Sequence, residues 1–214
     1  MPVDEYQVNQ WLLRVAKKYN VKLFDRGTIC VTEVVFPCLR KAYYDRIRRR
    51  LPTPVEALKV LGSEVHTLLQ DAMKEEGYDI EVKVRIELDQ FKLVGRVDAV
   101  KYDEKGNALE AIEIKTSNGL KEHALDSHKL QLQAYLQILH AKCGYLVYID
   151  RASGRVKVFK IRPDKYALRT VIERAKQLHE ALEHYRPPPP KRGPWCRICP
   201  HYWYCIGGGK QWKR

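Results

Sequence analysis

The spacing of apolar residues between positions 55 and 185 changes between a helical and a strand period, and the order of these changes limits the possible folds. Apolar residues recur every three or four positions from Val55 to Met73, which predicts an amphipathic helix. Apolar and polar residues alternate from Ile80 to Leu88, which predicts a half-buried strand. The remaining expected elements are strands at 91–102, 109–116, 144–149 and 155–161 and helices at 129–141 and 164–185. This order predicts an α/β or α+β domain built on a mixed sheet.

The length of 214 residues suits one domain with a small appendage rather than two full domains. Four consecutive prolines at 187–190 end the last predicted helix and form a stiff spacer. No apolar run is long enough for a membrane-spanning helix, and the N-terminus lacks the pattern of a secretory signal. We therefore expect a cytoplasmic protein with no membrane partner, in a compartment where cysteines stay reduced.

Positive charge is concentrated in two segments near the chain ends. The chain has 39 Lys and Arg against 26 Asp and Glu, a formal net charge of +13. The segments 40–50 and 184–214 carry almost all of this excess, and both are rich in aromatic residues. Such a balance favours a polyanionic partner, here a single strand of nucleic acid, although a solvated basic face is the alternative. The candidate contact residues are Arg40, Lys41, Arg48 and Arg49.

The turn at 104–107 joins two of the predicted strands as a hairpin and sets their register. A loop centred between Lys105 and Gly106 places Asp98 opposite Glu113, and Lys115 on the same face as Glu113. Two opposed carboxylates destabilise a sheet unless a cation compensates them, and carboxylate oxygens suit Mg²⁺ or Mn²⁺. The alternative is an ordinary exposed strand in which Lys115 pairs with the acids.

Two helices carry further candidates for this site. His66 lies on the polar side of the first helix, and Gln131 and Tyr135 stand four residues apart on the second, so they share a face. His66 is either a structural residue or an imidazole ligand that completes a carboxylate site. Gln131 and Tyr135 are either routine helix surface or groups that position a phosphate or Lys115.

The cysteines near the C-terminus have the spacing of metal ligands. Cys196, Cys199 and Cys205 need one more ligand to complete a tetrahedral zinc site or an iron–sulfur cluster. Cys38 is the leading candidate, and its participation would join the two basic segments in one lobe. A zinc site completed by His201 is the alternative. Cys30 and Cys143 lie in apolar stretches and are expected to be core thiols, with Cys30 the substitute if Cys38 is not the ligand.

Together these motifs resemble the RecB-like PD-(D/E)XK nucleases that contain an iron–sulfur cluster, and among them the CRISPR-associated exonucleases. The resemblance runs from about residue 38 to 205, and although each motif is weak alone, the elements together are strong because they occur at suitable spacing. The matching elements, in chain order, are Cys38, Gly62-x3-His66, Gly95-Arg-Val-Asp98, Glu113-Ile-Lys115, Gln131-x3-Tyr135 and the triplet Cys196, Cys199 and Cys205.

The resemblance implies a restriction-endonuclease-like fold, with one nuclease domain over 1–214, a core at about 54–186, and a small iron–sulfur lobe formed by about 28–53 together with 187–214. It implies a divalent metal held by His66, Asp98, Glu113 and the carbonyl of Ile114. The catalytic positions it implies are Asp98, Glu113, Lys115, Gln131 and Tyr135. The cysteine ligands it implies, usually for a [4Fe-4S] and sometimes for a [2Fe-2S] cluster, are Cys38, Cys196, Cys199 and Cys205.

The implied activity is Mg²⁺- or Mn²⁺-dependent cleavage of single-stranded DNA, commonly from 5′ to 3′. The implied role is to process DNA ends before the CRISPR integrase complex inserts them as spacers. Two alternatives stay open: a nuclease module of another DNA-repair system, and a non-catalytic DNA-binding module stabilised by zinc or an iron–sulfur cluster.

Overall fold

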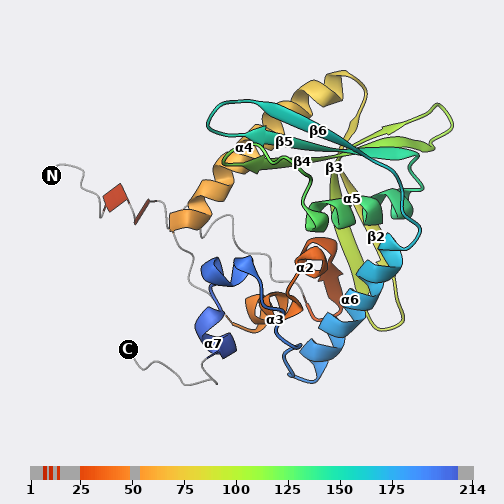
Figure 1. Cartoon of the computed structure of the whole chain (residues 1–214). Coiled ribbons are helices and arrows are strands. Elements are labelled where there is room, and N and C mark those ends of the chain that lie inside the picture. Colours follow the sequence, from red (N-terminus) through yellow and green to blue (C-terminus); the bar gives the residue numbers. More distant parts are fainter. Residues whose placement is uncertain (1–6, 9, 12–13, 15–24, 49–53, 207–214) are drawn as a thin grey trace.

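A computed structural model describes residues 7–8, 10–11, 14, 25–48 and 54–206 (Figure 1). Its elements, in chain order, are β1 (Thr28–Cys30), α2 (Val31–Val35), α3 (Leu39–Ile47), α4 (Pro54–Glu75), β2 (Asp79–Glu87), β3 (Lys92–Tyr102), β4 (Ala108–Ser117), α5 (Asp126–Leu139), β5 (Cys143–Asp150), β6 (Val156–Ile161), α6 (Ala167–Glu183), the 3-10 helix η1 (Pro194–Ile198) and α7 (Tyr202–Ile206).

The structure confirms each helix and strand that the apolar spacing predicts, with ends shifted by a few residues. The last long helix begins at Ala167 rather than at Asp164, because the Asp164 carboxylate accepts a hydrogen bond from the Tyr166 amide and forms a turn first. Five short elements, β1, α2, α3, η1 and α7, were not expected. Most of them span too few residues for a period of apolar residues to be recognised.

The strands form one mixed sheet, as predicted. Its order is β1-β3-β4-β5-β6, and β2 pairs with β3 off this path. The β1–β3 and β4–β5 pairs are parallel, whereas β2–β3, β3–β4 and β5–β6 are antiparallel. Because β4 and β5 are parallel, the chain between them must cross over one face of the sheet, and α5 makes this crossover.

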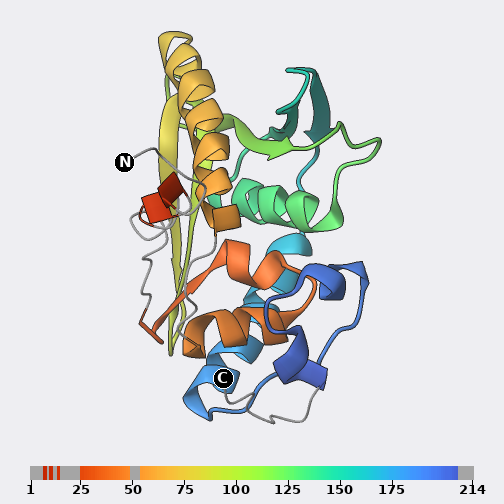
Figure 2. The ribbon, with the colours of Figure 1, turned by 90° about the vertical axis from the view of Figure 1, so that its left-hand side faces the viewer.

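Helices cover both faces of the sheet (Figure 2). α4 lies on one face, where Leu69 and Met73 pack against Ile112 and Ile114. α2, α5 and α6 lie on the other face and contribute to the main hydrophobic cluster with β3 and β5. α4 is the longest helix, and neither it nor any other helix in the described ranges is long and apolar enough to cross a membrane.

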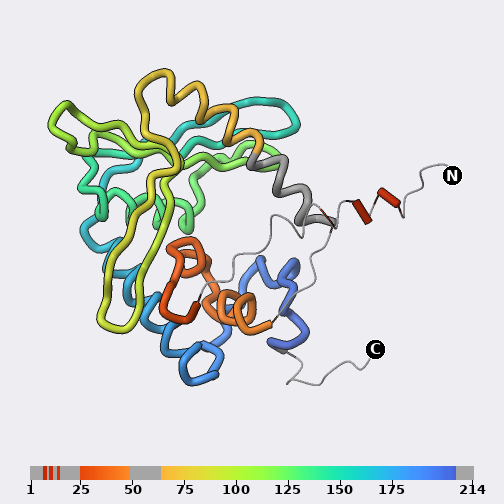
Figure 3. The backbone as a smooth tube through the Cα atoms, turned by 180° about the vertical axis from the view of Figure 1, so that it is seen from behind, coloured from red at the N-terminus to blue at the C-terminus, as the bar shows by residue number. Residues whose placement is uncertain are grey.

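Segments from the two ends of the chain lie side by side at one end of the molecule. In Figures 1 to 3 α3, coloured orange, lies beside the blue segment that contains η1 and α7. Arg40 Nε donates to the Pro188 carbonyl at 2.6 Å, and His201 Nε2 donates to Asp45 Oδ1 at 2.8 Å. These contacts bring the two basic segments together, and we call this region the terminal lobe: residues 36–48 together with 187–206.

The β3–β4 hairpin agrees with the predicted register over most of its length and departs from it near the turn. Ala99 pairs with Ile112 and Lys101 with Glu110, as expected, but Tyr102 pairs with Ala108 because the register shifts there. The Asp103 side chain causes the difference, since its Oδ1 accepts hydrogen bonds from the amides of Lys105 and Asn107 and tightens the loop. The β3–β4 ladder ends at Ala99, so Asp98 lies just beyond it.

Candidate active site

A buried polar cluster connects β4 with α5. Lys115 Nζ donates hydrogen bonds to Glu113 Oε1 at 2.7 Å and to Gln131 Oε1 at 3.1 Å. Gln131 Nε2 donates to the same Glu113 oxygen at 2.7 Å. Glu113 and Gln131 are buried, and Lys115 is half-buried. Glu113 and Lys115 therefore meet, as their shared face predicts, and Gln131 joins them. The strand is not exposed at Glu113, although Lys115 does pair with this acid, as the alternative held.

Tyr135 lies one helical turn beyond Gln131 and closes the back of the cluster. It is fully buried, and its hydroxyl accepts a hydrogen bond from Gln131 Nε2 at 3.4 Å. A Cβ atom at Gly95 would lie 2.5 Å from the Tyr135 ring, so only glycine leaves room for this tyrosine. Gln131 and Tyr135 are thus not helix surface, because α5 lies between the sheet and α6.

Asp98 and His66 lie beside this cluster. Asp98 Oδ2 accepts a hydrogen bond from the Ile114 amide at 2.7 Å and lies 3.6 Å from His66 Nδ1. The charges of Asp98, His66 and Lys115 all act on the Glu113 carboxylate, which places the four groups within electrostatic range of one another. The side chains expected around a metal therefore lie close together, next to the Ala99–Ile112 pair at which the pairing of β3 with β4 ends.

Burial dominates the electrostatics of Glu113. It raises the pKa of this carboxyl to about 7, against an opposing effect of Lys115, and the negative charge of Asp98 raises it further. Glu113 Oε2 is buried and has no hydrogen-bond partner in the described part of the chain. A buried carboxylate oxygen without a partner is costly, and a bound cation would remove that cost.

Sequence reasoning missed Gln70, which holds the backbone of Asp98 in place, and Glu81, which accepts a hydrogen bond from Gln70. Gln70, four residues after His66 on α4, donates to the Asp98 carbonyl at 3.1 Å and to Glu81 Oε1 at 2.8 Å. Glu81 has a φ of 56°, in the left-handed region that residues other than glycine rarely adopt. The spacing of Gln70 from His66 was the only available signal, and nothing in the sequence marks Glu81.

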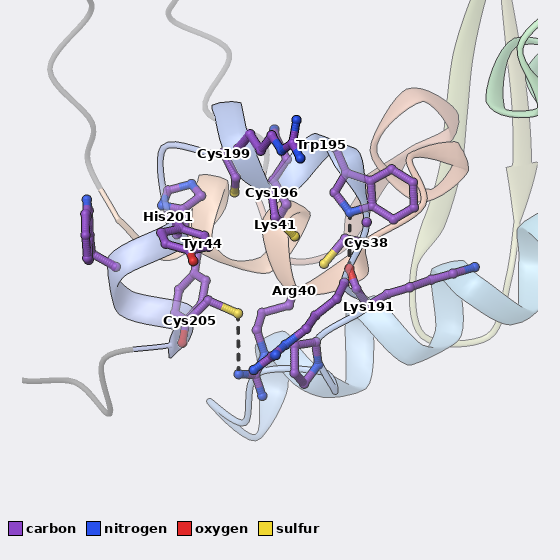
Figure 4. Close-up of a pocket in the computed structure, with 16 residues that line it drawn as sticks. Cys38, Arg40, Lys41, Tyr44, Lys191, Trp195, Cys196, Cys199, His201 and Cys205 are labelled. Carbon is purple, nitrogen blue, oxygen red and sulfur yellow. Dashed lines mark hydrogen bonds between the residues drawn. The ribbon is translucent and has the colours of Figure 1, made fainter.

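The four cysteines expected to bind a cluster line one cavity in the terminal lobe (Figure 4). The cavity has a volume of about 800 Å³, with Trp195 on one side and Tyr44 and His201 on the other. Cys38 is buried, and Cys196, Cys199 and Cys205 are half-buried. Cys30 and Cys143 do not line this cavity and are half-buried, so the expectation that they are core thiols holds only in part.

His201, which lines the cavity, forms a hydrogen bond with Asp45. Burial alone would raise the pKa of Asp45, but hydrogen bonds from His201 and Lys41 hold it below its ordinary value. His201 is buried, and the nitrogen that faces Asp45 is committed to this hydrogen bond. Burial raises the pKa of the Cys199 thiol, while the nearby Lys41 opposes the rise. A cationic side chain close to a thiol favours the thiolate form that binds metals.

Three of the four expected DNA-contact residues lie in the terminal lobe and make internal contacts. Arg40 binds the Pro188 carbonyl, Lys41 pairs with Asp45, and the Arg48 guanidinium lies 3.3 Å from the centre of the Tyr204 ring. Arg49 lies outside the described residues. Trp203 is 70% exposed and Ile198 86% exposed, so large apolar side chains accompany these cations at the surface.

Across the described ranges, no three or more His, Cys, Asp or Glu side chains converge closely enough to hold a metal ion. The donor sets are nevertheless chemically suited to the expected groups. The unpartnered Glu113 oxygen and Asp98 are the hard oxygen ligands that Mg²⁺ and Mn²⁺ accept, with the His66 imidazole beside them, and four thiols are the ligands of an iron–sulfur cluster. The residues present therefore fit both groups by chemistry.

Comparisons with known proteins agree with this chemistry. The family model described as the PD-(D/E)XK nuclease superfamily matches residues 71–206, which is more than half of the chain. The CRISPR-associated exonuclease Cas4 of Saccharolobus solfataricus is 35% identical over 132 residues, which cover 58% of this chain and 64% of that protein. The match thus spans slightly less than two thirds of that relative.

Solved structures share the fold. The crystal structure of SSO0001 is similar with a TM-score of 0.70 and 26% identity, covering 93% of this chain and 96% of that one. The alkaline exonuclease LHK-Exo from Laribacter hongkongensis, solved with dAMP, has a TM-score of 0.50 and 13% identity over 83% of this chain and 93% of its own. At that identity the second similarity concerns the fold alone.

Proposed function

Because the chain belongs to the PD-(D/E)XK nuclease superfamily, we propose that it is a metal-dependent exonuclease that shortens single-stranded DNA from its 5′ end. The observation that carries the proposal is the buried cluster of Glu113, Lys115 and Gln131, with Asp98 and His66 beside it. The similarity to a CRISPR-associated exonuclease supports a role in processing DNA ends for the CRISPR integrase complex.

The metal site of this proposal consists of His66, Asp98, Glu113 and the Ile114 carbonyl. A Mg²⁺ or Mn²⁺ ion at these ligands supplies the positive charge that polarises a phosphate and lowers the pKa of a water molecule. Glu113 supports this assignment because its free Oε2 lies buried without a partner among the described residues. Its pKa of about 7 reflects burial, and a nearby cation favours the charged form.

Lys115 is prepared to bind the substrate phosphate. An ammonium group has three N–H donors, and the hydrogen bonds to Glu113 and Gln131 use two of them. The third donor is available for a phosphate oxygen or for the attacking water. Gln131 fixes the orientation of both Lys115 and Glu113, so neither group needs to reorganise as charge develops on the phosphate.

The terminal lobe has a structural role in this proposal. Its four cysteines hold a [4Fe-4S] or [2Fe-2S] cluster, which joins the two chain ends and does not transfer electrons. Four cysteines lining one cavity support this assignment, because four thiolates are the usual ligands of such a cluster. Exposed Trp203 and the basic residues of the lobe suit the stacking and phosphate contacts of a single strand.

The first experiment is a time course with anaerobically purified protein and single-stranded DNA labelled at either end, in Mn²⁺ and in EDTA, alongside the visible spectrum. We expect a brown protein that shortens the DNA only with Mn²⁺ and releases the 5′ label first. Release of the 3′ label first would reverse the polarity. A colourless protein that binds DNA in a salt-dependent way without cleaving it would instead indicate a non-catalytic module.

A further inference from the structure

His128 on α5 lies beside the polar cluster but has no role in the function proposed above. It precedes Gln131 by three residues and Tyr135 by seven, so the three side chains share one face of the helix. The Lys115 charge acts on the His128 imidazole, which places the ring within electrostatic range of the ammonium group. A third polar side chain of α5 therefore faces the region in which a substrate phosphate would bind.

Tyr148 on β5 fixes the position of this imidazole. His128 Nδ1 lies 2.7 Å from the Tyr148 hydroxyl, and the two ring centres are 5.7 Å apart. Tyr148 is buried and lies directly beside Lys115 in the parallel ladder of β4 and β5. The sheet register thus holds the tyrosine, the histidine and the lysine together.

The hydrogen bonds of Tyr148 select one tautomer of His128. The Tyr148 oxygen accepts a hydrogen bond from the Leu125 amide at 3.1 Å, and its own proton needs an acceptor because the residue is buried. His128 Nδ1 is the acceptor at hydrogen-bond distance. A neutral imidazole that accepts at Nδ1 carries its proton on Nε2.

The Nε2–H group has no hydrogen-bond partner in the described ranges, so it is available to a ligand. Burial lowers the pKa of His128 to about 4, and the charge of Lys115 adds to this effect. The ring is therefore neutral at physiological pH. A neutral N–H donor and an ammonium group repel each other less than two cations would, and both can donate to one anion.

We propose that His128 is a substrate-contacting residue whose Nε2–H donates to a phosphate oxygen of the DNA bound at Lys115, with Tyr148 as the positioning residue that sets its tautomer. The inference rests on the proposed nuclease function, and it adds a group outside the Asp98, Glu113-x-Lys115 and Gln131-x3-Tyr135 motifs. A neutral donor orients the phosphate without adding the positive charge that would slow release of the product.

The test measures cleavage of single-stranded DNA by the wild type and by variants at this pair. We expect His128→Leu to lower kcat/KM by about 10- to 100-fold, the usual effect of losing one hydrogen bond to a charged group. His128→Gln, which keeps a donor at the position of Nε2, should recover most of that loss. Tyr148→Phe should lower kcat/KM less than His128→Leu does. His123→Gln, at an exposed loop position, is the matched control and should match the wild type.

A second readout separates substrate contact from a structural role. In protein with ¹⁵N-labelled histidine, kept in EDTA, the His128 signals should show a neutral ring protonated at Nε2 at pH 7, and that signal should shift when oligothymidylate binds. A ring protonated at Nδ1, an absence of any shift, or wild-type cleavage by His128→Leu would overturn the proposal. If the wild type binds DNA but does not cleave it, the nuclease function fails, while the shift still decides whether His128 contacts the strand.

Discussion

The buried cluster at Lys115 and the cysteine-lined cavity of the terminal lobe are held in place by different forces. The first depends on the sheet, since β4 pairs with β5 over eight successive residue pairs and Glu113 and Gln131 are buried against it. The second depends on short elements at the chain ends, and η1 has no buried residue. The fold therefore orients the active-site groups by itself. In the lobe, α3 packs into the main hydrophobic cluster, whereas the C-terminal segment relies on a few side-chain contacts.

This difference indicates what a bound group does in each region. At the active site the side chains are already oriented, so a metal ion contributes chemistry more than stability. In the lobe the hydrogen bonds from Arg40 to Pro188 and from His201 to Asp45 join segments that are distant in sequence. A cluster bound by four cysteines would add a far stronger connection between those segments, so we expect it to contribute mainly to stability.

The largest expected effect comes from removing charge at the active site. Replacing Lys115 or Asp98 by alanine should reduce cleavage of single-stranded DNA by at least about 100-fold, because Lys115 would stabilise charge that develops on the phosphate and Asp98 is a proposed metal ligand. Circular dichroism and the visible spectrum should stay those of the wild type, since the lobe does not depend on these residues.

Lys105→Ala, in the exposed turn of the β3–β4 hairpin, is the matched control for the loss of a lysine. It should cleave DNA like the wild type. Wild-type activity in Lys115→Ala and Asp98→Ala would remove both residues from the active site and would contradict the functional reading of the buried cluster.

The second effect concerns stability and belongs to the terminal lobe. Cys199→Ser should abolish the brown colour and lower the midpoint of thermal unfolding by more than about 5 °C, the shift that corresponds to a loss of about 2 kcal/mol in a domain of this size. Iron and zinc analysis of the same samples identifies the bound metal. Iron at wild-type content in Cys199→Ser would exclude this residue as a ligand.

Cys143→Ser provides the comparison, because Cys143 is half-buried like Cys199 but lies on β5, away from the cavity. It should keep both iron and colour. Zinc in place of iron in the wild type would support the zinc site instead, and replacing His201 would then decide whether that residue completes it.

A smaller effect is expected at Gln70, which supports the active site without belonging to it. Gln70→Leu removes the hydrogen bonds to the Asp98 carbonyl and to Glu81, so the backbone that carries Asp98 loses part of its support. We expect about a 10-fold decrease in kcat with little change in KM for DNA, which corresponds to roughly one hydrogen bond. Gln90→Leu, at an exposed position, should change neither constant.

The sequence predicted the active site better than its surroundings. Asp98, Glu113 and Lys115 could be placed together because a hairpin register follows from the position of its turn. The burial of Gln131 and Tyr135 could not be predicted, because it depends on α6 packing over α5, and no local pattern reports that contact. The contact between Tyr148 and His128 could not be predicted either, because it depends on the parallel pairing of β4 with β5.

The terminal lobe shows the same pattern. The association of Cys38 with the C-terminal triplet could be expected from the number of thiols a cluster requires, and the structure confirms that the four line one cavity. The contacts that hold the lobe, such as Arg40 with Pro188, join residues of ordinary type across 148 positions. Such pairings follow from the packing of α3 beside the C-terminal segment, and neither residue carries a signal of it.

The last expected effect is a difference in how the two regions respond to acid, measured by denaturant unfolding in EDTA. The folded protein lowers the pKa of His128 from 6.5 to about 4, so between these pH values the unfolded chain binds a proton that the folded chain does not. Stability is therefore lost as the pH falls through this window, and His128→Gln should lose less than the wild type. In the lobe, folding lowers the pKa of Asp45 from its ordinary value of 3.8, so this carboxylate affects stability only as the pH falls below about that value. The stability of Asp45→Asn should therefore follow that of the wild type down to this pH and differ from it only in stronger acid. Parallel curves for His128→Gln and the wild type from pH 7 to 4 would show that the imidazole is not held in a buried, neutral state beside Lys115.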